Sequence, residues 1–271
     1  MIIGIDIGST TTKAVTLEGR NVLRKVKTKA SDAVTSATGA FGKMMLENGI
    51  KLPEIKKIMI TGAGSTQIQG ELFGIPTQKV SEIEAIGTGG MFLSGEDNII
   101  IANIGTGTAI IEARKDNIIH LGGSGVGGGT ILGLAKKLLS LSDFKDIMSL
   151  AESGSLEHVD LLLEDIMETD LSFLNKKSTA SNFGKMLDTA RSEDLAFGII
   201  NLVYQVIGMM AVFAARSRNI GRVIVTGSGS HNALGKKILA DITTLHSINF
   251  EYPEDAEYTT AVGAGLFGLN N

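Results

Sequence analysis

The chain has 271 residues, of which 43% are hydrophobic and 20% are charged, and its formal net charge at pH 7 is −4. This composition fits one large or two ordinary globular domains with a substantial core, and the lack of any block of like charge argues against a nucleic-acid-binding surface. Cysteine is absent, which excludes disulfides, thiolate metal sites and cysteine-ligated iron–sulfur clusters.

The first part of the chain alternates strand-like and helix-like segments. Short apolar runs bounded by glycine or asparagine predict strands, and longer runs with helical spacing predict helices. Strands are predicted at 2–7, on both sides of a turn within 13–28, at 55–61 and at 76–80, and helices at 31–50, at 65–73 and from Ser81 onward. Asn48-Gly49 is a typical helix stop, and Ser81 with Glu84 fits a capping box.

The second part repeats the opening hairpin, and the polar stretch at 94–97 predicts a boundary between domains 1–96 and 97–271. Strands are predicted at 98–104, 108–114, 117–121, 222–226 and 247–251, and helices at 130–140, 143–152, 155–166, 182–217, 231–241 and 259–269. The loop 168–179 is a plausible lid or substrate edge. No apolar stretch reaches the roughly 18 residues of a membrane-span candidate, and Met1 leads directly into a strand, so we expect a cytoplasmic protein.

Three turns of glycine and hydroxyl residues each follow a buried strand run. The first contains Gly8, Ser9 and Thr10, the second Gly105, Thr106, Gly107 and Thr108, and the third Gly227, Ser228 and Gly229. Small residues allow backbone N–H groups and hydroxyls to face an anion. An ordinary hairpin explains any one of them equally well, but three in this order suggest a nucleotide held between two similar lobes.

The first turn is flanked by two charged residues. Lys13 could bind nucleotide phosphates and Asp6 could position Mg²⁺ through water. The Walker spacing of a P-loop is absent. Asn103 stands before the second turn where Asp6 stands before the first, which favours a duplicated phosphate-binding design over two unrelated hairpins.

A glycine-dense loop at 122–129 leads into an apolar helical run. A flexible loop is the simple interpretation, but ordering so many glycines is costly and favours a close backbone approach to a ligand. Gly127, Gly128 and Gly129 would present free N–H groups and the positive end of a helix dipole to an anion.

Two acidic residues open the predicted helix after Ser81. Either could simply stabilise the helix dipole, and Glu84 fits that role through its spacing from Ser81. Glu82 is not used by the cap and could act as a base toward a substrate hydroxyl. The histidines lack metal-ligand spacing, but His120 and His231 adjoin the glycine turns and either could contact a ligand.

These motifs resemble those of the acetate kinase, sugar kinase, Hsp70 and actin superfamily, and within it the type II pantothenate kinases. The resemblance rests on the stretches 103–108, 127–134, 180–184, 227–232 and 261–265. It implies an α/β, two-lobed actin-like ATPase fold with a ribonuclease H-like repeat in each lobe, and a homodimer. It also implies ATP and Mg²⁺ as cofactors, pantothenate as acceptor and Glu82 as catalytic base, with the acceptor also contacting His120, Gly123 and Ser124.

His120 departs from the family pattern, which has an arginine before the Val-Gly-Gly segment. A neutral imidazole lacks the permanent charge and the bidentate grip of a guanidinium on a carboxylate. Two alternatives therefore stay open. One is a kinase for another hydroxylated acceptor, such as an amino sugar or a pantetheine-like compound. The other is an ATPase that activates a partner or senses nucleotide without catalysis.

Overall fold

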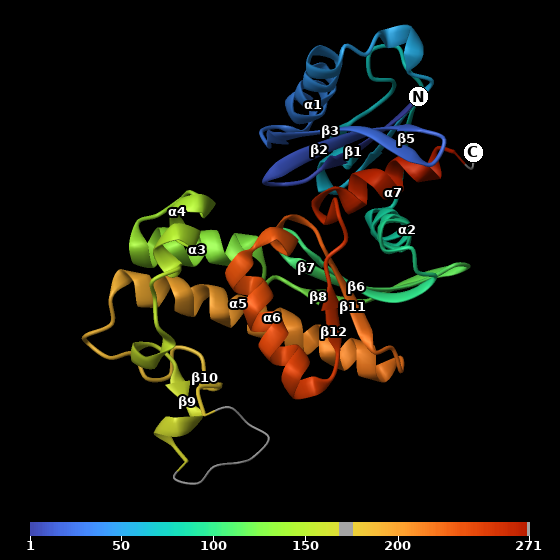
Figure 1. Ribbon diagram of the computed structural model, residues 1–271. Coiled ribbons are helices and arrows are strands. Elements are labelled where there is room, and N and C mark those ends of the chain that lie inside the picture. Colours follow the sequence, from blue (N-terminus) through green and yellow to red (C-terminus); the bar gives the residue numbers. More distant parts are fainter. Residues whose placement is uncertain (168–175, 270–271) are drawn as a thin grey trace.

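The computed structural model describes residues 1–167 and 176–269, and Figure 1 shows two sheets with helices between them and on their outer faces. The first sheet has the order β3-β2-β1-β4-β5 and consists of β1 (Ile2–Ile7), β2 (Thr11–Glu18), β3 (Asn21–Lys29), β4 (Lys57–Thr61) and β5 (Thr77–Lys79). Helix α1 (Ala33–Asn48) covers its outer face, where Phe41 and Met44 pack against the isoleucines of β1 and β4. We call this unit the first lobe.

The second sheet repeats this plan in the order β12-β11-β6-β7-β8. It consists of β6 (Asn98–Ile104), β7 (Thr108–Arg114), β8 (Asn117–Ser124), β11 (Arg222–Thr226) and β12 (Asn249–Glu251). Its outer helices are α3 (Gly128–Leu139), α4 (Phe144–Ala151), α5 (Ser192–Ser217) and α6 (Ala233–His246). In each lobe the first strand pairs antiparallel with the second and parallel with a later one. We call this unit the second lobe.

Two helices cross between the sheets, as Figure 1 shows. Helix α2 (Glu82–Ser94) packs on the inner face of the second sheet, and α7 (Thr259–Phe267) returns from the C-terminal end to pack on the first. A Cβ atom on Gly89 would collide with the Thr259 carbonyl, and one on Gly263 with the Ala85 carbonyl. Glycine at both positions therefore lets the helix backbones approach closely, which joins the two lobes.

Most predicted elements are confirmed within a few residues, but two predicted helices are wrong. A 3₁₀ turn, Ala63–Gln67, replaces the helix predicted at 65–73. The segment 155–166 forms two 3₁₀ turns, Leu156–His158 and Leu163–Asp165, around β9 (Leu161–Leu162), which pairs with β10 (Thr179–Ser181).

A buried carboxylate explains why residues 155–166 do not form the predicted helix. Asp160 is fully buried and accepts hydrogen bonds from the Thr179 hydroxyl at 2.9 Å, the Phe183 N–H at 2.9 Å and the Asn201 amide at 2.8 Å. A buried carboxylate needs such donors, and these come from distant parts of the chain, including Asn201 on α5, rather than from residues next to Asp160. The helix predicted over 182–217 begins only at Ser192. Most of the predicted lid loop, residues 168–175, lies outside the described residues.

Helix α5 contradicts the expectation that no apolar stretch is long enough to be a membrane-span candidate. It is the one helix among the described residues that is long and apolar enough to cross a membrane, by length and composition alone. Most of its apolar stretch is buried inside the protein, against α3, α4 and α6. The length and apolar composition of α5 are therefore those of a core helix, and a core helix can meet the same two criteria as a membrane-spanning helix.

Candidate active site

A row of polar side chains crosses the inner face of the first sheet. Asp6 pairs in register with Lys13 on β2 and with Thr61 on β4, and Lys13 pairs with Lys27 on β3. Paired residues on neighbouring strands share a face of the sheet. Gly4 lies two residues before Asp6 on this face and packs against α7, so the row faces the junction between the lobes.

Burial shifts the pKa values of two charged residues in this row, Lys13 and Asp6. Lys13 is only 6% exposed, and burial lowers the pKa of its ammonium, an effect that nearby Asp6 partly offsets. Burial raises the pKa of Asp6 to about 6, with Lys13 acting to lower it and Glu82 to raise it. Among the described residues, the side chains of Asp6 and Lys13 make no hydrogen bond and no ion pair. A desolvated cation and a desolvated carboxylate without partners are typical of a charged ligand's site.

A third charged residue, Glu82, begins α2. Its negative charge acts to raise the pKa of Asp6. Although the residue as a whole is exposed, partial burial of its carboxyl group raises its own pKa. A carboxylate with a raised pKa is a better proton acceptor at neutral pH than an ordinary one. The predicted capping box is wrong, because Ser81 precedes the helix but its hydroxyl makes no capping hydrogen bond.

The first two predicted turns meet directly across the lobe junction. The Ser9 hydroxyl lies 2.6 Å from that of Thr106, and the Thr10 hydroxyl lies 3.1 Å from it. Gly8 adjoins the first turn, and Gly105 and Gly107 flank Thr106 in the second. The structure therefore brings together two motifs that stand almost a hundred residues apart in the chain.

The glycine-rich loop contacts the second turn rather than presenting free N–H groups. The N–H of Gly128 donates to the Gly105 carbonyl and that of Gly129 to the Thr106 carbonyl, each at 2.9 Å, and the Gly127 N–H donates to the Thr130 hydroxyl. The expectation that these N–H groups are available to an anion is therefore wrong. A Cβ on Gly127 would lie 2.7 Å from the Thr106 carbonyl oxygen, so glycine is needed here because two backbones touch.

The third turn has a counterpart in the first lobe that the sequence analysis missed. In the first lobe, Thr61 ends β4 and leads into Gly62-Ala63-Gly64-Ser65. In the same way Thr226 ends β11 and leads into Gly227-Ser228-Gly229-Ser230. Gly62 has φ 85° and Gly227 has φ 79°. A Cβ on Gly62 would lie 2.6 Å from Asp6 Oδ1, and one on Gly227 would lie 2.9 Å from Asn103 Oδ1.

This repeat confirms that Asn103 occupies the position of Asp6. In the second lobe, the Thr226 hydroxyl donates to Asn103 Oδ1 at 2.9 Å. In the first lobe, the corresponding Thr61 hydroxyl is buried and has no hydrogen-bond partner among the described residues. The repeated Thr-Gly-x-Gly-Ser string could have revealed the fourth turn from the sequence alone.

The remaining predicted acceptor residues lie on β8. His120 is exposed and pairs with Ile111, and the neighbours on its face, Ile111 and Ile118, pack against α2. His120 therefore lies on the α2 side of the second sheet. Gly123 pairs with Ala109, and the Ser124 hydroxyl accepts from the Val126 N–H at 3.2 Å, so Ser124 helps to hold the glycine-rich loop. His231 lies in the 3₁₀ turn after Gly227 and is exposed.

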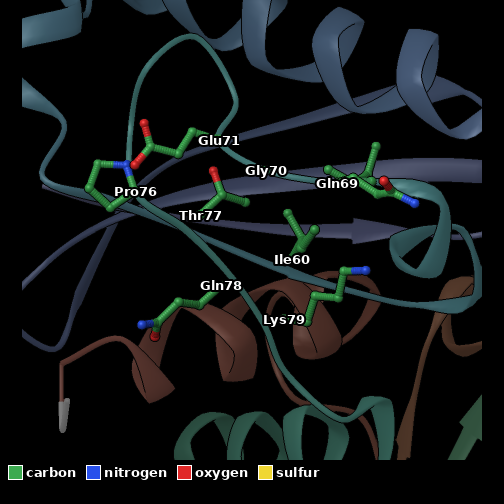
Figure 2. Close-up of a pocket in the computed structure, with 9 residues that line it drawn as sticks. Ile60, Gln69, Gly70, Glu71, Pro76, Thr77, Gln78 and Lys79 are labelled. Atoms are coloured by element: carbon green, nitrogen blue, oxygen red, sulfur yellow. The ribbon is translucent and has the colours of Figure 1, made fainter.

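Two hollows lie away from this cluster. One, of about 470 Å³, follows β5 and is lined by Ile60, Gln69, Glu71 and Lys79 among others (Figure 2). Ile60 belongs to the core on the α1 side, whereas Thr61, the next residue, belongs to the inner row. The second, of about 420 Å³, lies between β8 and the C-terminal half of α5.

The donor set of the inner cluster fits a magnesium nucleotide. Lys13 and the hydroxyls of Ser9, Thr10 and Thr106 suit phosphate oxygens. Mg²⁺ prefers carboxylate oxygens and keeps several waters, so the unpaired Asp6 suits it. No group of three or more His, Cys, Asp or Glu side chains that could hold a metal ion occurs among the described residues.

Comparisons with known structures define the class of the protein. An activator of 2-hydroxyisocaproyl-CoA dehydratase from Clostridium difficile with bound ADPNP has a TM-score of 0.72 at 20% identity, with 99% of this chain and 94% of that chain covered. A ROK family glucokinase from Streptomyces griseus with glucose and AMPPNP has a TM-score of 0.60 at 15% identity, with 97% of each chain covered. The protein therefore has the two-lobed, actin-like α/β fold that the sequence predicts.

Sequence comparison identifies the family. The sequence model of the Fumble family matches residues 25–264. A type II pantothenate kinase of Bacillus cereus (strain AH820) is 31% identical over 278 residues, which is 99% of this chain and 98% of that protein. One of Staphylococcus aureus (strain MRSA252) is 30% identical over 279 residues, with 99% and 100% covered. The chain belongs to the Fumble family of type II pantothenate kinases, and it is an ATP-dependent small-molecule kinase.

Proposed function

We infer that this protein transfers the γ-phosphoryl group of ATP to the primary hydroxyl of pantothenate, giving 4′-phosphopantothenate and ADP, the first step of coenzyme A biosynthesis. The family match along nearly the whole chain supports this reaction. The structural observation that carries it is the pair of Asp6 and Lys13, in register on β1 and β2 at the lobe junction, with the negative charge that Glu82 adds from the start of α2. These three residues supply a metal ligand, a cation for phosphate and a carboxylate base.

Each residue of the cluster has a distinct role in the proposed mechanism. Glu82 takes the proton from the pantothenate hydroxyl while the oxygen of that hydroxyl forms a bond to the γ-phosphorus. The bond between this phosphorus and the oxygen of the leaving ADP breaks. Lys13 and the hydroxyls of Ser9, Thr10 and Thr106 bind phosphate oxygens and hold them in line. Asp6 would hold Mg²⁺, which neutralises charge on the phosphates when bound. Such catalysis is mostly positioning and electrostatics.

The other predicted ligand contacts belong to this proposal as well. We propose that Gly227 and Ser228 contact the adenosine and that Gly127–Gly129 hold the second phosphate turn in place. On the acceptor side we propose His120, Gly123 and Ser124. His120 lies on the α2 side of the second sheet, and α2 begins with Glu82.

We also propose that the protein is a cytoplasmic homodimer without a nucleic-acid or membrane partner. The groove between β8 and α5 is the surface that we expect the second copy to cover. Leu121 and Met210 line it beside Phe213, a residue of α5 that is 62% exposed. Exposed aromatic side chains beside an apolar groove are typical of interfaces. Light scattering should give twice the 28.5 kDa of one chain, and a mass equal to one chain would contradict the dimer.

The identity of the acceptor is tested by the mass of the product. Pantothenate, pantetheine and an amino sugar are each incubated with the protein and Mg-ATP. We expect pantothenate to gain one phosphoryl group much faster than the amino sugar, because the family match covers nearly the whole chain. Phosphorylation of pantetheine or the amino sugar in preference to pantothenate would contradict pantothenate as the acceptor. It would indicate that His120 cannot replace the permanent charge and bidentate contacts of an arginine toward a carboxylate.

A further inference from the structure

The Thr61 hydroxyl is an unpartnered polar group on the inner face of the first sheet. Thr61 ends β4 and is fully buried, and its Oγ1 has no hydrogen-bond partner in the part of the chain that the structure describes. It pairs in register with Asp6 on β1, so the two residues share a face of the sheet. A buried hydroxyl without a partner costs stability unless a ligand or a water molecule satisfies it.

Two other unpartnered threonine hydroxyls of this sheet lie on its opposite face. Thr12 and Thr16 belong to β2 and share the face of Ala14, which packs on the α1 side. Lys13 alternates with them along the strand and therefore lies on the inner face. Within the described residues, Thr61 is the buried, unpartnered threonine that belongs to the row of the proposed site.

The second lobe contains the same row, but its polar atoms are already paired. It consists of Ala109, Asn103 and Thr226, in the strand order that corresponds to the row of the first lobe. The Thr226 hydroxyl donates to Asn103 Oδ1 at 2.9 Å, so this uncharged row is satisfied within the protein. In the first lobe, the side chains of Asp6 and Thr61 make no hydrogen bond with each other and remain available to a ligand.

The order of the row indicates what kind of group the Thr61 hydroxyl would meet. The strand order β2-β1-β4 puts Lys13 on one side of Asp6 and Thr61 on the other. A phosphate group suits the Lys13 side, because the ammonium attracts it and an ionised carboxylate repels it. Between Asp6 and Thr61 a hydrogen-bond donor fits best, since a carboxylate only accepts and a hydroxyl can also accept. Water molecules bound to Mg²⁺ are donors of this kind.

We propose that the Thr61 hydroxyl binds a water molecule of the hydrated Mg²⁺ ion that Asp6 holds, and that Thr61 thereby positions the metal on the side of Asp6 away from Lys13. The inference rests on the proposed function, which assigns Asp6 to Mg²⁺. The hydroxyl stays unpartnered in the ligand-free protein because its partner arrives with the nucleotide. The row of the second lobe binds no metal in this scheme, since Thr226 and Asn103 satisfy each other.

The stability of the ligand-free protein tests whether the Thr61 hydroxyl is kept for a ligand. Thr61→Val removes the hydroxyl and keeps the β-branched shape, and Thr226→Val is the matched control in the other lobe. Thr61→Val breaks no hydrogen bond, so we expect it to melt no lower than the wild type. Thr226→Val takes the donor from Asn103 and should melt about 2–4 °C lower.

Nucleotide affinity tests whether the missing partner belongs to the metal. The affinity for a non-hydrolysable ATP analogue is measured by calorimetry, once with Mg²⁺ and once with EDTA. For Thr61→Val we expect binding about tenfold weaker than the wild type with Mg²⁺ and unchanged with EDTA. Thr61→Ser keeps the hydroxyl and should retain most of the affinity. Thr226→Val should leave the ratio of the two affinities as it is in the wild type.

The proposal is overturned if Thr61→Val binds the Mg²⁺ complex as tightly as the wild type. It is also overturned if Thr61→Val melts below the wild type, which would assign the hydroxyl to the fold, or if binding weakens equally with Mg²⁺ and with EDTA, which would assign it to phosphate. These measurements need no acceptor. A wild-type protein that binds the magnesium nucleotide but phosphorylates no acceptor would therefore contradict the proposed function and leave this test intact.

Discussion

Replacing Glu82 by glutamine should lower kcat with pantothenate by about 10²- to 10⁴-fold, the usual contribution of a general base. The amide has nearly the same shape but cannot accept the hydroxyl proton at neutral pH. Glu82 is the first residue of α2 and is exposed, so the fold should not depend on its charge. Steady-state rates and the melting temperature measure the two effects separately.

Glu84→Gln is the matched control for this change. Glu84 lies in the same first turn and is exposed, and the loss of its charge at a helix N-terminus costs about 0.3–1 kcal/mol of stability. Burial raises the pKa of Glu82, so the loss of its charge should not lower the melting temperature. Only Glu82→Gln should lose turnover. A Glu82→Gln protein that turns over like the wild type would rule out this residue as the base.

Replacing Asp6 by asparagine should inactivate the protein and stabilise it at the same time. The amide removes the proposed metal ligand, and we expect turnover to fall by about 10²- to 10³-fold, as for other lost electrostatic contacts in active sites. Burial raises the pKa of Asp6 from 3.8 to about 6, so its charged form is disfavoured in the folded state. At pH 7 the variant should gain on the order of 3 kcal/mol in unfolding free energy.

The sign of this effect can be checked by varying pH. A carboxyl group whose pKa is raised on folding stabilises the protein below the unfolded value of 3.8, and this contribution is lost as pH rises through the folded value of about 6. The stability difference between Asp6→Asn and the wild type should therefore shrink as pH falls and disappear in acid. Denaturant unfolding at several pH values measures it. A variant that is active, or no more stable than the wild type at pH 7, would contradict the role given to Asp6.

The sequence predicts the strands and turns of this site well because their signals are local. Each apolar strand run ends in glycine and hydroxyl residues, and the match of Asp6 with Asn103 indicates that the design is duplicated. The structure confirms that Ser9, Thr10 and Thr106 meet. Glycine is informative in such places because a side chain would fill the space that a second backbone or a ligand occupies.

The features that the sequence did not predict depend on contacts between distant residues. Asp160 draws donors from residues 179, 183 and 201 and replaces a predicted helix with turns. Lys27 and Glu257 form an ion pair although they are 230 positions apart, and no pattern in either segment indicates it. The prediction that the N–H groups of the glycine-rich loop are available to an anion was wrong for a related reason. These groups donate to carbonyls of the second turn, and the spacing of residues along the chain does not show which acceptor a donor binds.

The central claim is most directly tested by the release of ADP from Mg-ATP by the purified protein, with and without pantothenate. We predict a low rate without acceptor and a strong stimulation by pantothenate, with one ADP formed for each pantothenate consumed. That result would mean that His120 is compatible with a carboxylate-bearing acceptor. ATP binding without stimulation by pantothenate would contradict the claim and would direct attention to another acceptor or to a nucleotide sensor.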